Sequence, residues 1–396
     1  MDRVRNPFSP GAGTQPPELA GREELRETAR VVVERVRLGL PTKSLLMVGL
    51  RGVGKTVLLD RVRDETEATG IQTVRIEAPE NRSLPALLAP ELRQALLRLS
   101  RNEQAKDLSQ RALRGLAGFA KALKVKYHDI EVGFDFDPEP GLADNGDLEH
   151  DLQALLEAAG AAAQKAGTAL VLFIDELQYV TEEELAALIV ALHRTAQRRV
   201  PVVLIGAGLP QLRGQMGRAK SYAERLFDFP GIGPLLEPAA RQAIEKPVMA
   251  QNVNVDEDAL VQIVRDTRGY PYFLQEWGKH AWDAAEASPI TRHDVDVASK
   301  AAIAALDDSF FRVRFDRLTP VEKKYLRAMA DLGAGPHRSG DIALILKRKV
   351  TSLGPTRSQL IAKGMIWSPS HGDTAFTVPL FDEFMRRIMP GDDWRY

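Results

Sequence analysis

Short apolar runs alternate with amphipathic stretches through the first half of the chain. The mixed stretch 71–78, half of it apolar, predicts a strand, and runs dominated by apolar residues lie at 43–50, 169–175 and 201–205. Such runs are typical of strands covered on both faces of a parallel sheet. Stretches with helical periodicity precede and separate them, at 22–40, 56–70, 147–166 and 182–197. Because strands and helices alternate, the pattern predicts a mostly parallel α/β sheet with right-handed connections.

The region 83–140 interrupts this alternation. Helical periodicity with many Lys and Arg extends over 83–122, and the alternating stretch 125–137 predicts a hairpin or extended insertion. The basic part, 93–126, could form a second nucleic-acid face or a partner site. We prefer its interpretation as a solvated helical surface, because charge along one helix face usually meets water.

The strand pattern stops near Leu235. Helical periodicity over 235–305 predicts a small helical lid, and from 306 the order helix, helix, helix, hairpin predicts a winged helix. Its first helix has a clear start, with Thr319 as cap, Pro320 in the first turn and Glu322 completing a capping box. We therefore expect an α/β core with an N-terminal arm over 1–234, a lid over 235–305 and a winged helix over 306–396.

Composition narrows the functional classes. The formal net charge is −1, so binding to nucleic acid requires a local basic patch and not an overall field. The absence of cysteine excludes disulfides, thiolate metal sites and thiol nucleophiles. The N-terminus lacks the apolar core of a signal peptide, and the apolar runs are too short to cross a bilayer. We expect a cytoplasmic protein without membrane contact.

The stretch "GLRGVGKT", Gly49 to Thr56, lies directly between an apolar run and a helix and matches G-x-x-x-x-G-K-[ST]. Glycines let successive backbone N–H groups converge on phosphate oxygens at the positive end of the helix. Lys55 is expected to reach the β- and γ-phosphates, and the Thr56 hydroxyl to bind Mg²⁺. The expected nucleotide-binding residues of this stretch are Gly49, Gly52, Val53, Gly54, Lys55, Thr56 and Val57.

A second motif, "ALVLFIDELQYV", supplies a carboxylate pair at the end of an apolar run. Asp175 is expected to hold Mg²⁺ through water, and Glu176 to act as the general base for the attacking water. ATP, ADP and Mg²⁺ are thus the expected ligands. The run at 201–205 leads into Gly206, Ala207 and Gly208, which offer no polar γ-phosphate sensor. That role stays unassigned, with Gln178 as a weak substitute.

With these motifs in order, the sequence resembles AAA+-related P-loop ATPases. It is most similar to the STAND class and to the initiator ATPases of archaeal and eukaryotic origin recognition. "LAGRE" resembles the N-terminal STAND motif that lies against adenine, which implies that Leu19 and Ala20 contact the base; Leu25 replaces its final Glu. The resemblance implies a P-loop NTPase sheet of AAA+ type, followed by the helical lid and the winged helix.

Two further stretches carry the resemblance. "AERLFDF" resembles the AAA+ segment with the arginine finger, which implies that Arg225 acts on the nucleotide of a neighbouring subunit in a homo-oligomer. "RGYPYFLQ" matches the GxP signature of STAND helical domains, which implies that Pro271 lies near the base. Initiators usually have a sensor arginine here, and the Tyr-Pro-Tyr of this chain favours the STAND class.

The C-terminal module has a local basic excess. Between Arg338 and Met365 there are six Lys or Arg residues and a single acid, Asp341. The helix around 354–364 has the position of a recognition helix, and its polar residues include types that contact phosphates and base edges. The expected contacts to double-stranded DNA are Lys347, Arg348, Thr356, Arg357, Ser358 and Lys363.

The preferred hypothesis is an ATP-dependent switch that binds DNA through the winged helix and whose hydrolysis depends on assembly. The alternative is a STAND-type signalling ATPase whose winged helix binds a protein partner. A third reading, an inactive scaffold that holds ADP, is disfavoured by the intact Asp175–Glu176 pair.

Overall fold

The computed structural model describes residues 1–11, 13–130 and 136–395, which form two compact units. Residues 22–48 and 55–231 make up the sheet unit, and residues 1–21, 49–54 and 232–396 make up the helical unit. The expected domain boundaries near 235 and 306 stay predictions. The hairpin expected over 125–137 falls largely outside the described residues.

The sheet unit is built on parallel strands. They are β1 (Ser44–Val48), β2 (Gln72–Glu77), β3 (Leu170–Asp175), β4 (Val202–Gly208) and β5 (Phe227–Asp228), in the spatial order β2-β3-β4-β1-β5. All residues of β1, β3 and β4 are buried, as expected of strands covered on both faces. The predicted parallel α/β sheet is confirmed, and only the short edge strand β5 had no recognisable signal.

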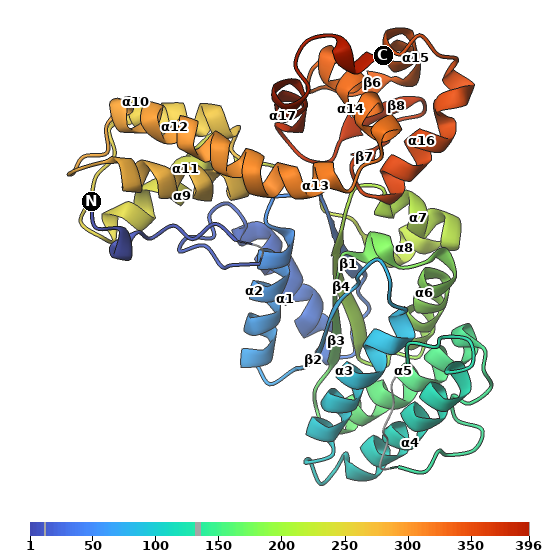
Figure 1. Ribbon diagram of the computed structural model, residues 1–396. Coiled ribbons are helices and arrows are strands. Elements are labelled where there is room, and N and C mark those ends of the chain that lie inside the picture. The colour runs from blue at the N-terminus through green and yellow to red at the C-terminus, as the bar shows by residue number, and fades with distance from the viewer. Residues whose placement is uncertain (12, 131–135, 396) are drawn as a thin grey trace. The chain divides into compact units, whose positions relative to one another are not determined.

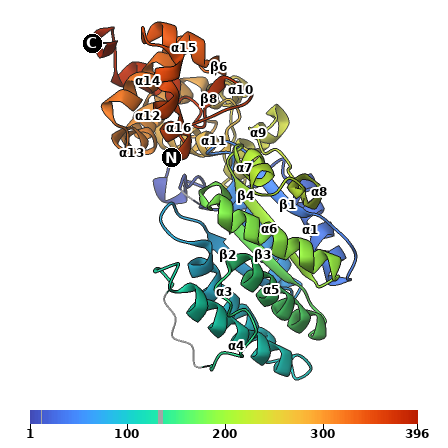
Figure 2. The same ribbon diagram turned by 90° about the vertical axis from the view of Figure 1, so that its right-hand side faces the viewer.

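Helices cover both faces of this sheet. They are α1 (Glu23–Arg37), α2 (Lys55–Ala68), α3 (Leu84–Leu99), α4 (Lys106–Leu123), α5 (Leu148–Lys165), α6 (Glu182–Gln197), α7 (Leu212–Ala219) and α8 (Ala223–Leu226). Figure 1 shows α1 and α2 on one face and α5 and α6 on the other, and Figure 2 shows α5 and α6 from the front. Helix α6 starts with a capping box, Thr181 with Glu184.

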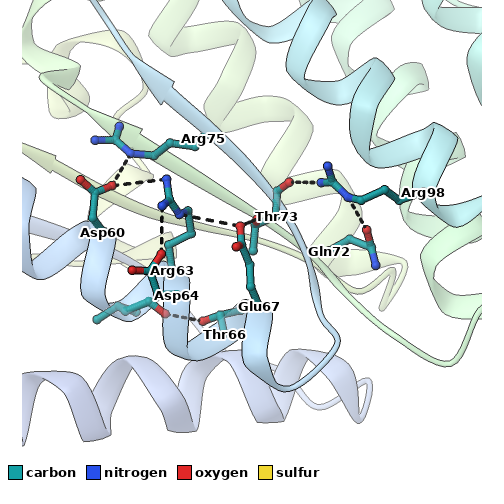
Figure 3. Close-up of polar contacts among 10 residues, drawn as sticks. Asp60, Arg63, Asp64, Thr66, Glu67, Gln72, Thr73, Arg75 and Arg98 are labelled. Carbon is teal, nitrogen blue, oxygen red and sulfur yellow. Dashed lines mark hydrogen bonds and ion pairs between the residues drawn. The ribbon is translucent and has the colours of Figure 1, made fainter.

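Ion pairs and hydrogen bonds fix the edge strand β2 to its flanking helices (Figure 3). Arg75 of β2 donates to Asp60 of α2 over 2.7 Å. Arg98 of α3 donates to the Gln72 side chain over 3.0 Å and to the Thr73 carbonyl over 2.8 Å. These contacts hold β2 in register with β3, beside the end of the strand that carries Asp175.

The helical unit begins with α9 (Glu237–Met249), α10 (Glu257–Thr267), α11 (Pro271–Ala284) and α12 (Arg292–Leu306), as the sequence predicts for the lid. The N-terminal arm packs here: the Trp282 indole donates to the Asp2 carbonyl over 2.8 Å, and Phe8 lies against Gly278. The arm was expected beside the α/β core, but its aromatic contacts place it in the core of the helical unit.

The remainder of the helical unit contains α13 (Arg312–Asp316), α14 (Pro320–Leu332), β6 (His337–Arg338), α15 (Ser339–Ile345), α16 (Val350–Ala362), β7 (Ile366–Trp367), β8 (Asp373–Phe376) and α17 (Phe381–Ile388). The antiparallel strands pair in the order β6-β8-β7. Buried residues of 240–306 and 311–394 share one hydrophobic core. A separate domain starting at 306 therefore stays a prediction. No helix in the described ranges is long and apolar enough to cross a membrane.

A buried ion pair joins α14 to Lys363, the residue that directly follows α16. Glu322, 1% exposed, accepts from Lys363 Nζ over 2.7 Å and from the Thr319 N–H over 2.7 Å. Burial disfavours the charged carboxylate, but the hydrogen bonds from Lys363 and Thr319 prevail and hold the pKa of Glu322 below its usual range. The pair therefore stabilises the fold above the ordinary carboxyl pKa.

Lys363→Met should lower the free energy of unfolding, because it leaves Glu322 buried without its cation. Breaking a fully buried pair costs about 3–5 kcal/mol, and we expect about 2 kcal/mol here because Lys363 remains partly exposed. Denaturant unfolding measures the change, with exposed Lys300→Met as control. The difference should shrink as the pH falls through the lowered pKa of Glu322. A loss equal to that of the control would contradict the structural role of Lys363.

Candidate functional site

The carboxyl ends of three adjacent strands meet at one edge of the sheet. Strand β4 lies between β1 and β3, with Val48 opposite Gly208 and Ile174 opposite Gly206. In open parallel sheets, ligands bind beyond the carboxyl ends of the strands. Residues that directly follow β1, β3 and β4 are therefore the ones placed for chemistry.

The glycines of the 49–56 stretch are required by its backbone. Gly52 and Gly54 have φ values of +80° and +86°, in the left-handed region that glycine adopts at no steric cost. At Gly49, a Cβ atom would lie 2.1 Å from the Ile232 carbonyl oxygen. Lys55 and Thr56, which directly follow the loop in the chain, begin α2, and the first N–H groups of a helix have no acceptor within it. A glycine-rich loop that leads into a helix N-terminus is typical of an anion site.

At the end of β3, Asp175 lies next to the start of α2. Its carboxylate is 1% exposed and accepts hydrogen bonds from the Thr56 hydroxyl and from the Glu176 N–H, the latter over 2.8 Å. Burial raises the pKa of Asp175, and the charge of Glu176 acts in the same direction, while the Thr56 hydroxyl opposes both. The structure thus brings together the two residues predicted to hold the metal.

One oxygen of the Asp175 carboxylate accepts no hydrogen bond from the described residues. This oxygen, Oδ2, is buried. The nearest cation is on β2, where Arg75 Nη2 lies 3.7 Å from it. A buried polar atom without a partner is rare and calls for a ligand or ion. A hydroxyl and a carboxylate at one point are ligands that suit Mg²⁺, which usually binds one or two protein oxygens together with substrate phosphates. The residues present fit Mg²⁺.

Glu176 follows in an unusual backbone conformation. Its φ of +53° and ψ of +34° are left-handed, which is uncommon for a residue with a side chain and occurs at functional sites. Its carboxylate accepts a hydrogen bond from the side-chain amide of Gln178. Sequence reasoning left Gln178 as a substitute for the γ-phosphate sensor and missed Arg75, whose signal was a cation between the apolar residues Val74 and Ile76 of β2.

In the helical unit, the backbone of the glycine-rich loop contacts two other segments. The Tyr272 N–H donates to the Gly52 carbonyl over 3.1 Å, directly after Pro271, the first residue of α11. The Arg51 N–H donates to the Thr377 carbonyl over 3.0 Å, at the end of β8. The structure therefore brings the loop and the predicted GxP segment together.

Two other predicted residues also lie in the helical unit. Ala20 is buried in the core of this unit, and Leu19 is half-buried beside it in the chain. Their predicted contact with the nucleotide base stays a prediction.

Arg225 lies on the short helix α8 of the sheet unit. Its side chain is exposed and forms no ion pair with any residue in the described ranges. An exposed, unpaired guanidinium is available to another molecule, and its predicted role as an arginine finger stays a prediction.

The predicted DNA contacts differ in what they do within the helical unit. Lys347, Arg348 and Ser358 are exposed, and Thr356 is half-buried. The Arg357 guanidinium instead donates to Thr374, Ser368 and the Asp373 carbonyl over 2.8–2.9 Å, and Lys363 pairs with Glu322. Arg357 and Lys363 therefore have structural contacts that the sequence did not predict.

Comparison with known proteins agrees with this geometry. Residues 18–205 match the family described as AAA ATPase domain, and residues 308–385 match a domain of unknown function, DUF8462. No curated protein matches the chain. The AAA ATPase match supports nucleotide binding and ATPase chemistry for the part of the chain that contains both motifs.

Solved structures with the same fold include the Walker-type ATPase PABY2304 of Pyrococcus abyssi. It has 17% identity and a TM-score of 0.59, over 96% of this chain and 99% of that one. The Aeropyrum pernix Orc1 protein in complex with DNA has 16% identity and a TM-score of 0.47, over 94% of each chain. The AAA ATPase domain match and the fold shared with the Pyrococcus abyssi ATPase confirm the P-loop, AAA+-like α/β fold with a helical C-terminal region.

Asp175→Asn should weaken the magnesium-dependent part of nucleotide binding, because it removes the charge of the carboxylate without changing its size. The loss of one outer ligand typically lowers metal affinity about 10- to 100-fold. Titration of a fluorescent ATP analogue with Mg²⁺ and with EDTA measures this part separately. Asp64→Asn, an exposed carboxylate of α2, is the matched control. Equal magnesium dependence in both variants would remove Asp175 from the metal site.

Proposed function

We propose that this protein is an ATP-dependent molecular switch, which binds ATP with Mg²⁺ at 49–56, hydrolyses it slowly and presents a C-terminal winged helix to double-stranded DNA. The observation that carries the nucleotide part is the buried Asp175 carboxylate, which is bonded to Thr56 and has one oxygen without a hydrogen-bond partner in the described residues. The AAA ATPase domain match over 18–205 supports the same conclusion.

The proposed chemistry assigns each residue a role. Lys55 and the N–H groups at the start of α2 bind the phosphates, while Thr56 and Asp175 hold the metal. Bound Mg²⁺ supplies positive charge against the β- and γ-phosphate oxygens. Glu176 accepts a proton from the attacking water while the water oxygen forms a bond to the γ-phosphorus. The bond between the γ-phosphorus and the β-phosphate oxygen of the leaving ADP then breaks. Leu19, Ala20, Gly49, Val53, Val57 and Pro271 complete the proposed nucleotide site.

Backbone contacts of the loop supply a route from the nucleotide to the C-terminal part. Two loop residues bond directly to it: Gly52 accepts from Tyr272, and Arg51 donates to Thr377. Nucleotide binding that reorients the loop peptides must break or move these bonds. We propose that the displacement is passed through Thr377 and β8 to the hairpin of the winged helix.

The order α14-β6-α15-α16-β7-β8 supports the winged-helix interpretation. Lys347 and Arg348 lie in the exposed turn between α15 and α16, and Ser358 is exposed on α16, the proposed recognition helix. These residues are the proposed phosphate and base contacts, with Thr356 at the edge of the surface. Arg357 and Lys363 hold the domain together and present this surface.

Arg225 is the proposed contact between subunits. Its exposed guanidinium on α8 would complete the transition-state charge stabilisation on the nucleotide of a neighbouring copy. Hydrolysis would then depend on assembly.

A second function, signalling through a protein partner, is favoured by one observation. Leu344 on α15 is 77% exposed and lies three residues before Lys347. An apolar side chain beside a basic turn suits a protein surface better than a phosphate backbone. In this reading, ATP occupancy sets an on or off state and the C-terminal part binds protein.

Lys55→Ala should abolish nucleotide binding, whereas Glu176→Gln should bind ATP and retain it. The first removes the phosphate cation, and the second removes only the base, whose loss lowers turnover about 10²- to 10⁴-fold. Binding is measured with a fluorescent analogue and turnover by phosphate release. Normal hydrolysis by Glu176→Gln would show that another group is the base.

Binding to a DNA duplex should weaken steeply with salt, because phosphate contacts release counterions. The double variant Lys347→Glu/Arg348→Glu should reduce the slope of log affinity against log salt by about 2, close to 0.9 for each lost contact. The charge reversal Lys300→Glu on α12 is the control. Absence of duplex affinity at low salt, with and without ATP, would favour the protein-partner function.

A further inference from the structure

The side-chain amide of Gln178 is held between two strand ends of the sheet unit. Gln178 lies in the helical turn after β3 and is 6% exposed. Its Nε2 donates to the Glu176 carboxylate, and its Oε1 accepts from the Leu209 N–H over 2.9 Å. Both ends of the amide thus have partners, one of them the proposed general base and the other the residue that follows β4.

The direction of the amide follows from the chemistry of its partners. A backbone N–H can only donate, so the atom that faces Leu209 must be the oxygen. The NH₂ group then faces Glu176, where an ionised carboxylate can only accept. The two partners therefore determine one orientation, and no alternative amide flip satisfies both.

The end of β4 is shaped around this side chain. A Cβ atom at Gly208 would lie 2.9 Å from Gln178 Oε1, so β4 has no room there for a polar side chain of its own. The Gln215 side chain of α7 also donates to the Gln178 carbonyl over 3.1 Å. Gln178 supplies, from the turn after β3, the polar group that β4 lacks.

We infer that Gln178 is a positioning residue for hydrolysis, which holds one oxygen of the Glu176 carboxylate and leaves the other for the attacking water. This inference rests on the proposed ATP hydrolysis. A glutamate side chain at a partly exposed position has several rotamers, and a fixed donor selects one of them. Because a general base acts only within hydrogen-bond reach of its water, this selection sets the fraction of productive encounters.

The test is Gln178→Glu, which is nearly isosteric. Its carboxylate still accepts from the Leu209 N–H but cannot donate to Glu176, and it places a second negative charge beside the base. Turnover at saturating ATP should fall about 100-fold, the typical cost of misplacing a reacting group by about 1 Å. Affinity for ATP with Mg²⁺ should stay nearly unchanged.

A second variant and a control keep the test decisive. Gln178→Asn is neutral but one methylene shorter, so it cannot span both partners and should show the same loss of turnover at unchanged affinity. The control is Gln262→Glu in the helical unit, where a buried glutamine (5% exposed) donates to Asp296 over 2.8 Å. This identical change should lower the melting temperature without changing turnover per bound ATP.

Each outcome decides between the possibilities. Slow turnover with retained affinity in both Gln178 variants supports the inference. Turnover equal to that of the unaltered protein overturns the inference about Gln178 and leaves the proposed ATPase intact. A parallel loss of affinity and turnover also overturns the inference, because it gives Gln178 a structural role. If the unaltered protein binds ATP but never hydrolyses it, with or without DNA, the proposed hydrolysis and this inference both fail.

Discussion

The arrangement at the end of β3 depends on a buried carboxylate that has too few hydrogen-bond donors. Asp175 is excluded from water at the end of β3, and its Oδ2 accepts no hydrogen bond from the described residues. Leaving a buried polar atom unsatisfied costs about 1–3 kcal/mol, and more for a charged group. The fold tolerates this cost because Thr56 and the Glu176 N–H bond to the carboxylate, and Arg75 lies 3.7 Å away. In the function that we propose, a divalent cation removes the remaining deficit.

The backbone conformations of the two motif segments explain which residue types occur in them. Gly52 and Gly54 are left-handed, and Gly49 has no space for a side chain, so the loop can present its backbone. Glu176 adopts a left-handed backbone that places its side chain beside the Gln178 amide. Gly208 leaves space for that amide. Within the sheet unit, the absence of a side chain at Gly208 thus serves the polar amide of Gln178.

Lysine and arginine side chains of the C-terminal part serve two purposes. Their excess over acidic residues is evident in the sequence, but only the structure shows which of them bond within the fold and which are exposed. Arg357 is bonded to the hairpin and Lys363 to buried Glu322, whereas Lys347 and Arg348 face solvent. A cation within hydrogen-bond reach of a buried carboxylate contributes to stability first, because separating the pair would leave a charge unpaired. Only the exposed cations remain for a partner.

The sequence by itself determined the elements and the phosphate-binding chemistry. Strands β1 to β4, their helices and the capping boxes at Thr181 and Thr319 follow from local patterns, since periodicity, caps and glycine requirements are properties of neighbouring residues. Only the tertiary structure decided the strand order, the addition of β5 and α17, and the packing of residues 2–8 on α11. It also decided the contacts of Arg75, Gln178, Arg357 and Lys363. Those contacts join residues distant in the chain or depend on a precise side-chain direction, and no local pattern encodes which buried partner a side chain will meet.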